Sequence, residues 1–94
     1  MIQVAISARL RKRVDQLPPE VRAAASEAIA NVAAAFGHPQ QHGGLGLRKL
    51  GRYSYEVRAA LQLRVVFFLD GDTLTAYDVM DHNEVRRWVR GQVK

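Results

Sequence analysis

The sequence contains no cysteine among its 94 residues. A disulfide framework and a thiolate metal site are therefore excluded, and a reducing cytoplasmic setting fits this composition. The sequence also lacks any apolar run near the roughly 18 residues that a membrane-spanning helix needs. Its first residues, MIQVAIS, have no charged segment and too short an apolar run for a signal peptide. We therefore expect a cytoplasmic protein.

Acidic residues are scarce relative to basic ones. Fourteen lysines and arginines stand against nine aspartates and glutamates, which leaves a formal net charge of +5. Such an excess favours an anionic partner, either nucleic acid or an acidic protein. Hydrophobic residues make up 48% of the chain, enough for a packed core, and the length predicts one domain spanning residues 1–94.

Proline is also scarce, and two of the three prolines stand together between two predicted helices. The first helix is expected over residues 8–17, after a weak strand over residues 1–6. Ser7 is its predicted N-cap, and Leu10, Val14 and Leu17 share one face. The basic run over residues 9–13 is expected to face solvent, with contact to phosphate as the alternative. Pro18 and Pro19 end this helix and begin the next.

The second helix is expected over residues 20–36, where alanine dominates. Its apolar stripe runs from Val21 to Phe36, and Gly37 is the expected C-terminal cap. Together the two helices predict a helical hairpin. His38 and His42 follow in a loop, four residues apart, but no acid or cysteine stands near them to complete a metal site.

Residues 46–79 contain four β-type runs, LRKL, YSYEVR, LQLRVVFFL and TLTAYDV. The pair Asp70-Gly71 predicts a type I′ hairpin turn, which needs positive φ at both central residues. Alternation predicts one buried face and one polar face that meets solvent. The predicted buried face contains Tyr53, Tyr55, Val57, Leu63, Val65, Phe67 and Leu69.

Two arginines, Arg58 and Arg64, are expected to oppose each other across the hairpin of residues 55–59 and 63–69. Like charges in direct opposition are unfavourable unless an anionic group lies between them. Glu56 would be that group if the cluster is structural. A bound phosphate would be that group if the cluster is functional, because guanidinium groups bind phosphate oxygens bidentately. The residues leave both interpretations open.

The last segment predicts a helix over residues 83–93, capped by Asp81 or Asn83. Trp88 is interpreted as a core anchor for this helix rather than a platform for a base. His82 lies where the last strand ends. Histidine suits acid–base chemistry near neutral pH, although a surface or capping role is equally consistent with this position.

The order GLRKL, YEVR, LRVVFFLDGDTLTAYDV and DHNEVRRWV is similar to the pattern of the RelE/ParE toxin superfamily. The similarity covers nearly the whole sequence and is strongest over residues 45–89. It implies an α+β fold, with an N-terminal strand and a helical hairpin packed on a small, mostly antiparallel twisted sheet and a short C-terminal helix.

The resemblance further implies a bacterial type II toxin that forms a hetero-oligomer with its antitoxin. Ribonuclease members of the superfamily cleave mRNA on the ribosome, using the RNA's own 2′-hydroxyl and no metal or other cofactor. Residues matching the catalytic positions are Arg58, Arg64, His82 and Lys49. Residues expected to bind RNA are Arg48, Arg52, Arg86 and Arg87.

The sequence departs from the ribonuclease pattern near its end. Asn83 and Arg86 stand at or near the positions of a further arginine and a tyrosine, so the tyrosine acid or base is missing. His82 would then supply the acid–base group. Two alternatives follow from the departure: a gyrase inhibitor, in which the basic first helix matters more than His82, and a catalytically inactive relative that only binds an antitoxin.

Overall fold

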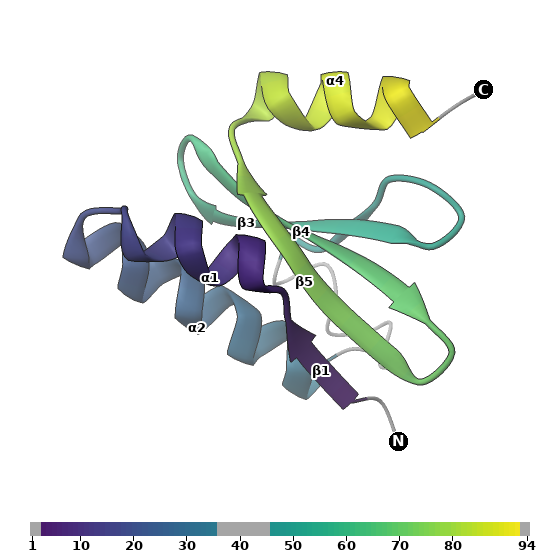
Figure 1. Cartoon of the computed structure of the whole chain (residues 1–94), viewed down its shortest axis with the longest axis horizontal. Helices are drawn as coiled ribbons and strands as arrows, with labels where there is room; N and C mark the ends of the chain where they lie inside the picture. The colour runs from purple at the N-terminus through teal and green to yellow at the C-terminus, as the bar shows by residue number, and fades with distance from the viewer. Residues whose placement is uncertain (1–2, 36–45, 93–94) are drawn as a thin grey trace.

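A computed structural model describes residues 3–35 and 46–92 of the chain (Figure 1). Helices and strands follow one another in the order β1 (Gln3–Ile6), α1 (Ala8–Asp15), α2 (Pro19–Ala35), β2 (Arg48–Lys49), β3 (Ser54–Ala60), β4 (Leu63–Asp70), β5 (Thr73–Met80) and α4 (His82–Gln92). Some residues with a predicted role lie outside the described residues. They are Phe36 of the predicted helix stripe, Gly37 as the predicted cap, and His38 and His42 of the predicted loop.

The strands form one five-stranded sheet in the order β1-β5-β4-β3-β2. β1 runs parallel to β5, and the other neighbours are antiparallel. The helical hairpin of α1 and α2 packs on one face, and α4 packs on the other (Figure 1). The expected α+β architecture is therefore confirmed. No described helix is long and apolar enough to cross a membrane.

The main core lies between the helical hairpin and the sheet. Leu10 of α1 and Val32 of α2 pack there against alternate residues of the central strands, including Val57, Val65 and Phe67. Ser7 caps α1 as predicted, because its hydroxyl accepts a hydrogen bond from the backbone N–H of Leu10 at 3.0 Å. The predicted stripes of both helices are thus confirmed in the described part of the chain.

The β4–β5 turn differs from the expected type I′ turn. Asp70 pairs with Thr73, so the two central residues are Gly71 and Asp72. Of these two residues, only Gly71 has a positive φ, at 59°. Glycine at the first central position is the requirement of a type II′ turn, which joins antiparallel strands equally well. The hairpin was predicted correctly, but its turn begins one residue later.

The second face of the sheet does not meet solvent as expected, because α4 covers part of it. Val66 is fully buried there with Met80 and Val85, and Trp88 and Val89 pack around them. The ring centroids of Trp88 and Phe68 lie 5.2 Å apart, which confirms Trp88 as a core anchor. Tyr53, in contrast, is 58% exposed, so its assignment to the core was wrong.

Candidate functional site

Two of the predicted catalytic arginines lie in one row across the sheet. Arg58 of β3 is paired with Arg64 of β4, and Arg64 is paired on its other side with Met80 of β5. His82 begins α4 two residues beyond Met80 and is exposed. Since neighbouring strands lie about 4.8 Å apart, this register places Arg58 and Arg64 side by side. They lie at the end of the sheet where β5 ends and His82 begins α4.

Arg64 also holds the turn between β3 and β4. Its Nη1 atom donates to the carbonyl oxygens of Ala60, Leu61 and Leu63 at 3.3–3.4 Å. This two-residue turn contains no glycine, and the register shifts between Arg58 and Ala60. One nitrogen of Arg64 therefore stabilises the hairpin, a structural role that the strand pattern did not predict.

Glu56 does not lie between the two arginines. It is paired across the strands with Arg48 of β2, and Arg48 Nη2 lies 3.1 Å from Glu56 Oε1. Glu56 is only 5% exposed, and its Oε2 atom is buried without a hydrogen-bond partner in the described part of the chain. The expectation that Glu56 lies between Arg58 and Arg64 is thus wrong, and no described carboxylate pairs with either arginine.

The remaining predicted residues lie on β2, in the connection between β2 and β3, and farther along α4. Lys49 is paired with Tyr55, three residues before Arg58 on β3, so the register does not bring it into the arginine row. It lines a groove of about 400 Å³ between β2 and α4. The groove's cations are Arg48, Lys49, Arg86 and Arg90, and its apolar lining is Leu50, Val85 and Val89.

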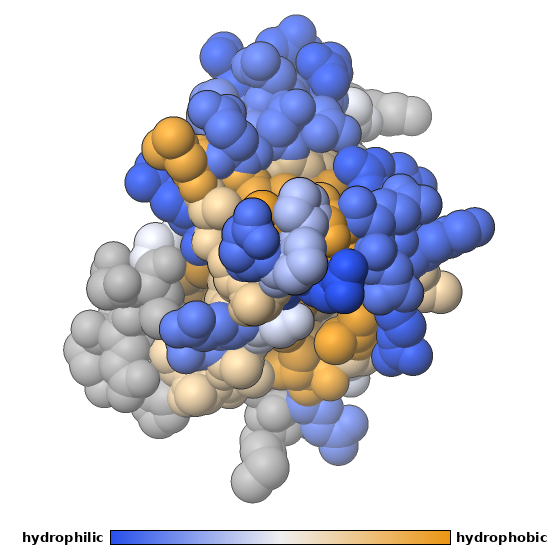
Figure 2. All heavy atoms as spheres, turned by 90° about the vertical axis from the view of Figure 1, so that its left-hand side faces the viewer, coloured by the Kyte–Doolittle hydropathy of each residue, from blue (hydrophilic) through white to orange (hydrophobic). Residues whose placement is uncertain are grey.

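Arg90 was missed by the sequence interpretation, although it follows Arg86 by four residues and this spacing places two residues on one helix face. Arg87 is exposed on α4 and does not line the groove. Arg52 lies over the ring of Tyr53, with its Cζ atom 5.6 Å from the ring centroid. Figure 2 shows hydrophilic side chains gathered over α4 at the top of the molecule.

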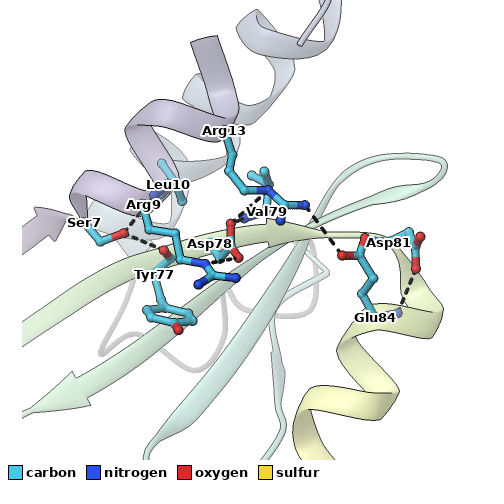
Figure 3. Close-up of polar contacts among 9 residues, drawn as sticks. All are labelled: Ser7, Arg9, Leu10, Arg13, Tyr77, Asp78, Val79, Asp81 and Glu84. Carbon is cyan, nitrogen blue, oxygen red and sulfur yellow. Dashed lines mark hydrogen bonds and ion pairs between the residues drawn. The ribbon is translucent and has the colours of Figure 1, made fainter. Parts of the chain in front are cut away.

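A second polar cluster joins α1, β5 and α4, and the sequence did not predict it (Figure 3). Asp78 is 1% exposed, and its Oδ2 atom lies 2.8 Å from Arg9 Nε. Its Oδ1 atom accepts from the Val79 backbone N–H at 2.8 Å and lies 3.4 Å from Arg13 Nε. Arg13 Nη2 in turn lies 3.6 Å from Glu84 of α4.

The basic run on α1 is exposed as expected, apart from half-buried Arg13, but two of its arginines also pair with a buried carboxylate. A buried carboxylate needs charged or hydrogen-bonding partners, and Arg9 and Arg13 supply them to Asp78. The hydrogen bond with Asp78 raises the pKa of Arg9 above its ordinary value. Arg11 and Lys12, the other cations of the run, are exposed and have no ion pair with a described carboxylate.

The start of α4 is held by a reciprocal cap. The Glu84 backbone N–H donates to Asp81 Oδ1 at 2.8 Å, and the Asp81 backbone N–H donates to Glu84 Oε1 at 3.1 Å. The hydrogen bond from the Glu84 backbone is the main cause that lowers the pKa of Asp81. Of the two predicted caps, Asp81 is confirmed. The cap fixes the helix end on which His82 stands.

Comparison with known proteins identifies this architecture. The sequence matches no protein-family model and no curated protein. A RelB–RelE antitoxin–toxin complex from Methanococcus jannaschii aligns with a TM-score of 0.63 and 13% identity, over 89% of this chain and 96% of that one. A YoeB/ParE toxin from Agrobacterium tumefaciens aligns with a TM-score of 0.60 and 14% identity, over 86% and 99%. The chain has the RelE/ParE toxin fold.

A toxin–antitoxin complex from Mycobacterium tuberculosis has the same fold, with a TM-score of 0.54 and 21% identity over 86% of this chain and 98% of that one. The resemblance expected from the sequence is therefore confirmed at the level of the RelE/ParE fold. Both archaeal and bacterial structures share it, so the fold does not distinguish between these sources. Sequence identities this low support a shared RelE/ParE fold, but they do not transfer the role of any individual residue.

Proposed function

We propose that the protein is the toxin of a type II toxin–antitoxin system and that it cleaves mRNA on the ribosome. The observation that carries the proposal is the row of Arg58 and Arg64, which no described carboxylate neutralises, at the sheet end beside exposed His82. Support for the toxin role comes from the solved structures with the same fold, which are toxins and antitoxin complexes.

In the proposed reaction, the 2′-hydroxyl of the RNA attacks the adjacent phosphorus. The bond from phosphorus to the 5′-oxygen of the next nucleotide breaks, which leaves a cyclic phosphate and a free 5′-hydroxyl. Arg58 and Arg64 stabilise the negative charge that develops on the pentacoordinate phosphorus. His82 transfers a proton as the acid or base of the reaction, in place of the missing tyrosine.

The proposed partner is an acidic antitoxin that covers the arginine row. A segment bearing carboxylates would provide the anions that Arg58 and Arg64 lack, and would exclude RNA by occupying the same surface. Binding of the free chain to ribosomes should therefore be strong, and binding of the toxin–antitoxin complex weak. Equal binding by both would contradict this mode of inhibition.

The test expresses single variants in cells, each with one exposed residue replaced, and compares growth and RNA ends. Arg58→Ala and His82→Ala should each remove the growth arrest and the RNA ends that wild type creates inside codons. Arg64→Ala is a poorer choice, because Arg64 also holds the turn. Arg11→Ala is the matched control: it removes an exposed arginine of α1 and should leave cleavage intact. Growth arrest without cuts inside codons would overturn the proposal.

The gyrase-inhibitor alternative needs a free basic surface on α1. Arg9 and Arg13 are engaged with Asp78 and Glu84, which weighs against it. Stabilised gyrase–DNA cleavage complexes with intact mRNA would nevertheless favour that alternative over RNA cleavage. Unaffected growth on expression without a partner would favour a catalytically inactive relative that binds only an antitoxin.

A further inference from the structure

The groove between β2 and α4 continues into a second hollow, because both are lined by Leu50 and Val89. The second hollow has a volume of about 370 Å³ and extends past the β2–β3 connection to Arg52 and Tyr53. We call the two together the α4 groove. Among the described residues that line it are five cations and no aspartate or glutamate. Two other hollows, in contrast, are lined by carboxylates: one by Glu27, and the other by Asp81 and Glu84.

An exposed aromatic ring stands at the far end of the α4 groove. Tyr53 is 58% exposed, although large apolar side chains usually bury most of their surface. Its backbone is fixed, since its carbonyl oxygen accepts from the Leu69 N–H at 2.8 Å just before β3 begins. The Arg52 guanidinium lies over the ring. An exposed ring on an anchored backbone, with a cation beside it, resembles the platforms on which unpaired bases stack.

We propose that Tyr53 and Arg52 form a base-stacking platform for single-stranded RNA, and that the α4-groove cations contact the phosphates leading to it. This inference rests on the proposed function and deepens it by adding a second contact with the substrate. Tyr53 precedes Arg58 by five residues, or about 17 Å along an extended strand. The platform therefore holds a nucleotide a short distance from the cleaved phosphate and keeps the strand in register.

The combination of side chains favours RNA over an acidic protein segment as the occupant. Carboxylates of a peptide would be satisfied by the cations alone. A single-stranded nucleic acid also presents flat bases, which need an exposed aromatic ring or guanidinium plane to stack on. The α4 groove offers both kinds of contact along one path.

The experiment measures the binding of a short fluorescently labelled oligouridylate to the full chain by anisotropy, at several salt concentrations. Tyr53→Ala should weaken binding about ten-fold, the effect expected for one lost base stack. Tyr53→Phe should stay within about two-fold of wild type, because it keeps the ring. Tyr53→Leu keeps apolar bulk without a ring, so it should bind as weakly as Tyr53→Ala and shows that lost stacking, not lost folding, is responsible.

Salt dependence separates stacking from phosphate contacts. Tyr53→Ala should leave the slope of log affinity against log salt unchanged, whereas Arg90→Ala should reduce it by about one. Arg90 is preferable to Arg48 here, because Arg48 also neutralises buried Glu56. Ile6→Ala, an exposed apolar residue on the opposite sheet edge, is the matched control and should bind as wild type.

An abasic oligomer has the same phosphates but no bases, so its affinity for wild type and for Tyr53→Ala should be equal. Equal oligouridylate affinity of wild type and Tyr53→Ala would overturn the platform, yet leave ribosomal cleavage by Arg58 and His82 unaffected. Conversely, a chain that binds oligouridylate through Tyr53 but cuts no mRNA would overturn only the proposed function. Preferential binding of a polyglutamate peptide, or of the corresponding DNA oligomer, would overturn the assignment to RNA.

Discussion

Arg58 of β3 and Arg64 of β4 are direct cross-strand neighbours, and no described carboxylate pairs with either. Like charges in this arrangement destabilise an antiparallel pair, by up to about 1 kcal/mol. Three backbone carbonyls accept hydrogen bonds from Arg64 and offset part of that cost. An arrangement that is unfavourable in the free protein becomes favourable once a phosphate lies between the two guanidinium groups.

Replacing Arg58 with glutamate should therefore stabilise the fold and abolish toxicity. The new carboxylate would pair with Arg64, raising the free energy of unfolding by about 0.5 kcal/mol, while the surface loses a phosphate ligand. Urea denaturation and growth after induction measure the two effects. Arg58→Gln removes the repulsion without adding an ion pair and should give an intermediate stability. Arg58→Glu that is less stable yet still toxic would contradict both arguments.

The cluster around Asp78 should show an asymmetry between its partners. Asp78→Ala removes the acceptor for Arg9 and for the Val79 N–H in a buried site, so we expect a loss of about 2 kcal/mol. Arg9→Ala should cost much less, because the Arg9 side chain is 57% exposed and Arg13 still neutralises Asp78. Chemical denaturation of both variants checks this, and a larger loss for Arg9→Ala would rule it out.

Because of the α4 cap, part of the free energy of unfolding should change with pH in the acid range. The pKa of Asp81 is lower in the folded chain than its ordinary value, chiefly because the Glu84 backbone N–H donates to it. Ionised Asp81 therefore stabilises the fold above about pH 4, and this contribution disappears as the pH falls through the lowered folded pKa.

Asp81→Asn keeps a capping oxygen but has no charge to titrate. Wild type should be the more stable protein at neutral pH, and the difference in denaturation midpoint should close on acidification. The fluorescence of Trp88, which lies in α4 and packs against the cluster of Val66, Met80 and Val85, reports the transition. A difference that stays constant from neutral to strongly acid pH would show that the Asp81 charge contributes nothing.

Two glycine substitutions should have opposite effects on stability. Gly71 has a φ of 59°, so Gly71→Ala should destabilise the β4–β5 hairpin by about 1 kcal/mol, although a Cβ atom there would meet nothing within 4 Å. Gly91 lies in α4 with equally open space, and Gly91→Ala should stabilise the chain by up to about 1 kcal/mol. Thermal unfolding distinguishes the two, and equal shifts would contradict the backbone argument.

Features that depend on near neighbours in the chain follow from the sequence alone. The Ser7 cap, the helical stripes on Leu10 and Val32, and the alternation through Val65 and Phe67 follow from local hydrogen bonds and side-chain periodicity. A short loop between two strands likewise determined that Arg58 opposes Arg64. These signals predicted the helical hairpin and the strand pairing, whereas the α+β architecture was implied by the resemblance to the RelE/ParE pattern.

Which polar groups are buried, and with which partners, depends instead on contacts between distant segments. Asp78 is 69 residues from Arg9 in the chain, and no local pattern indicates that they meet. α4 packs on Val66, and Glu56 is buried beside Arg48. Tyr53 stays exposed just before β3, because the alternation begins with the strand and does not extend into its turn. Burial depends on what distant segments cover, and this determines which cations remain available to bind an anion.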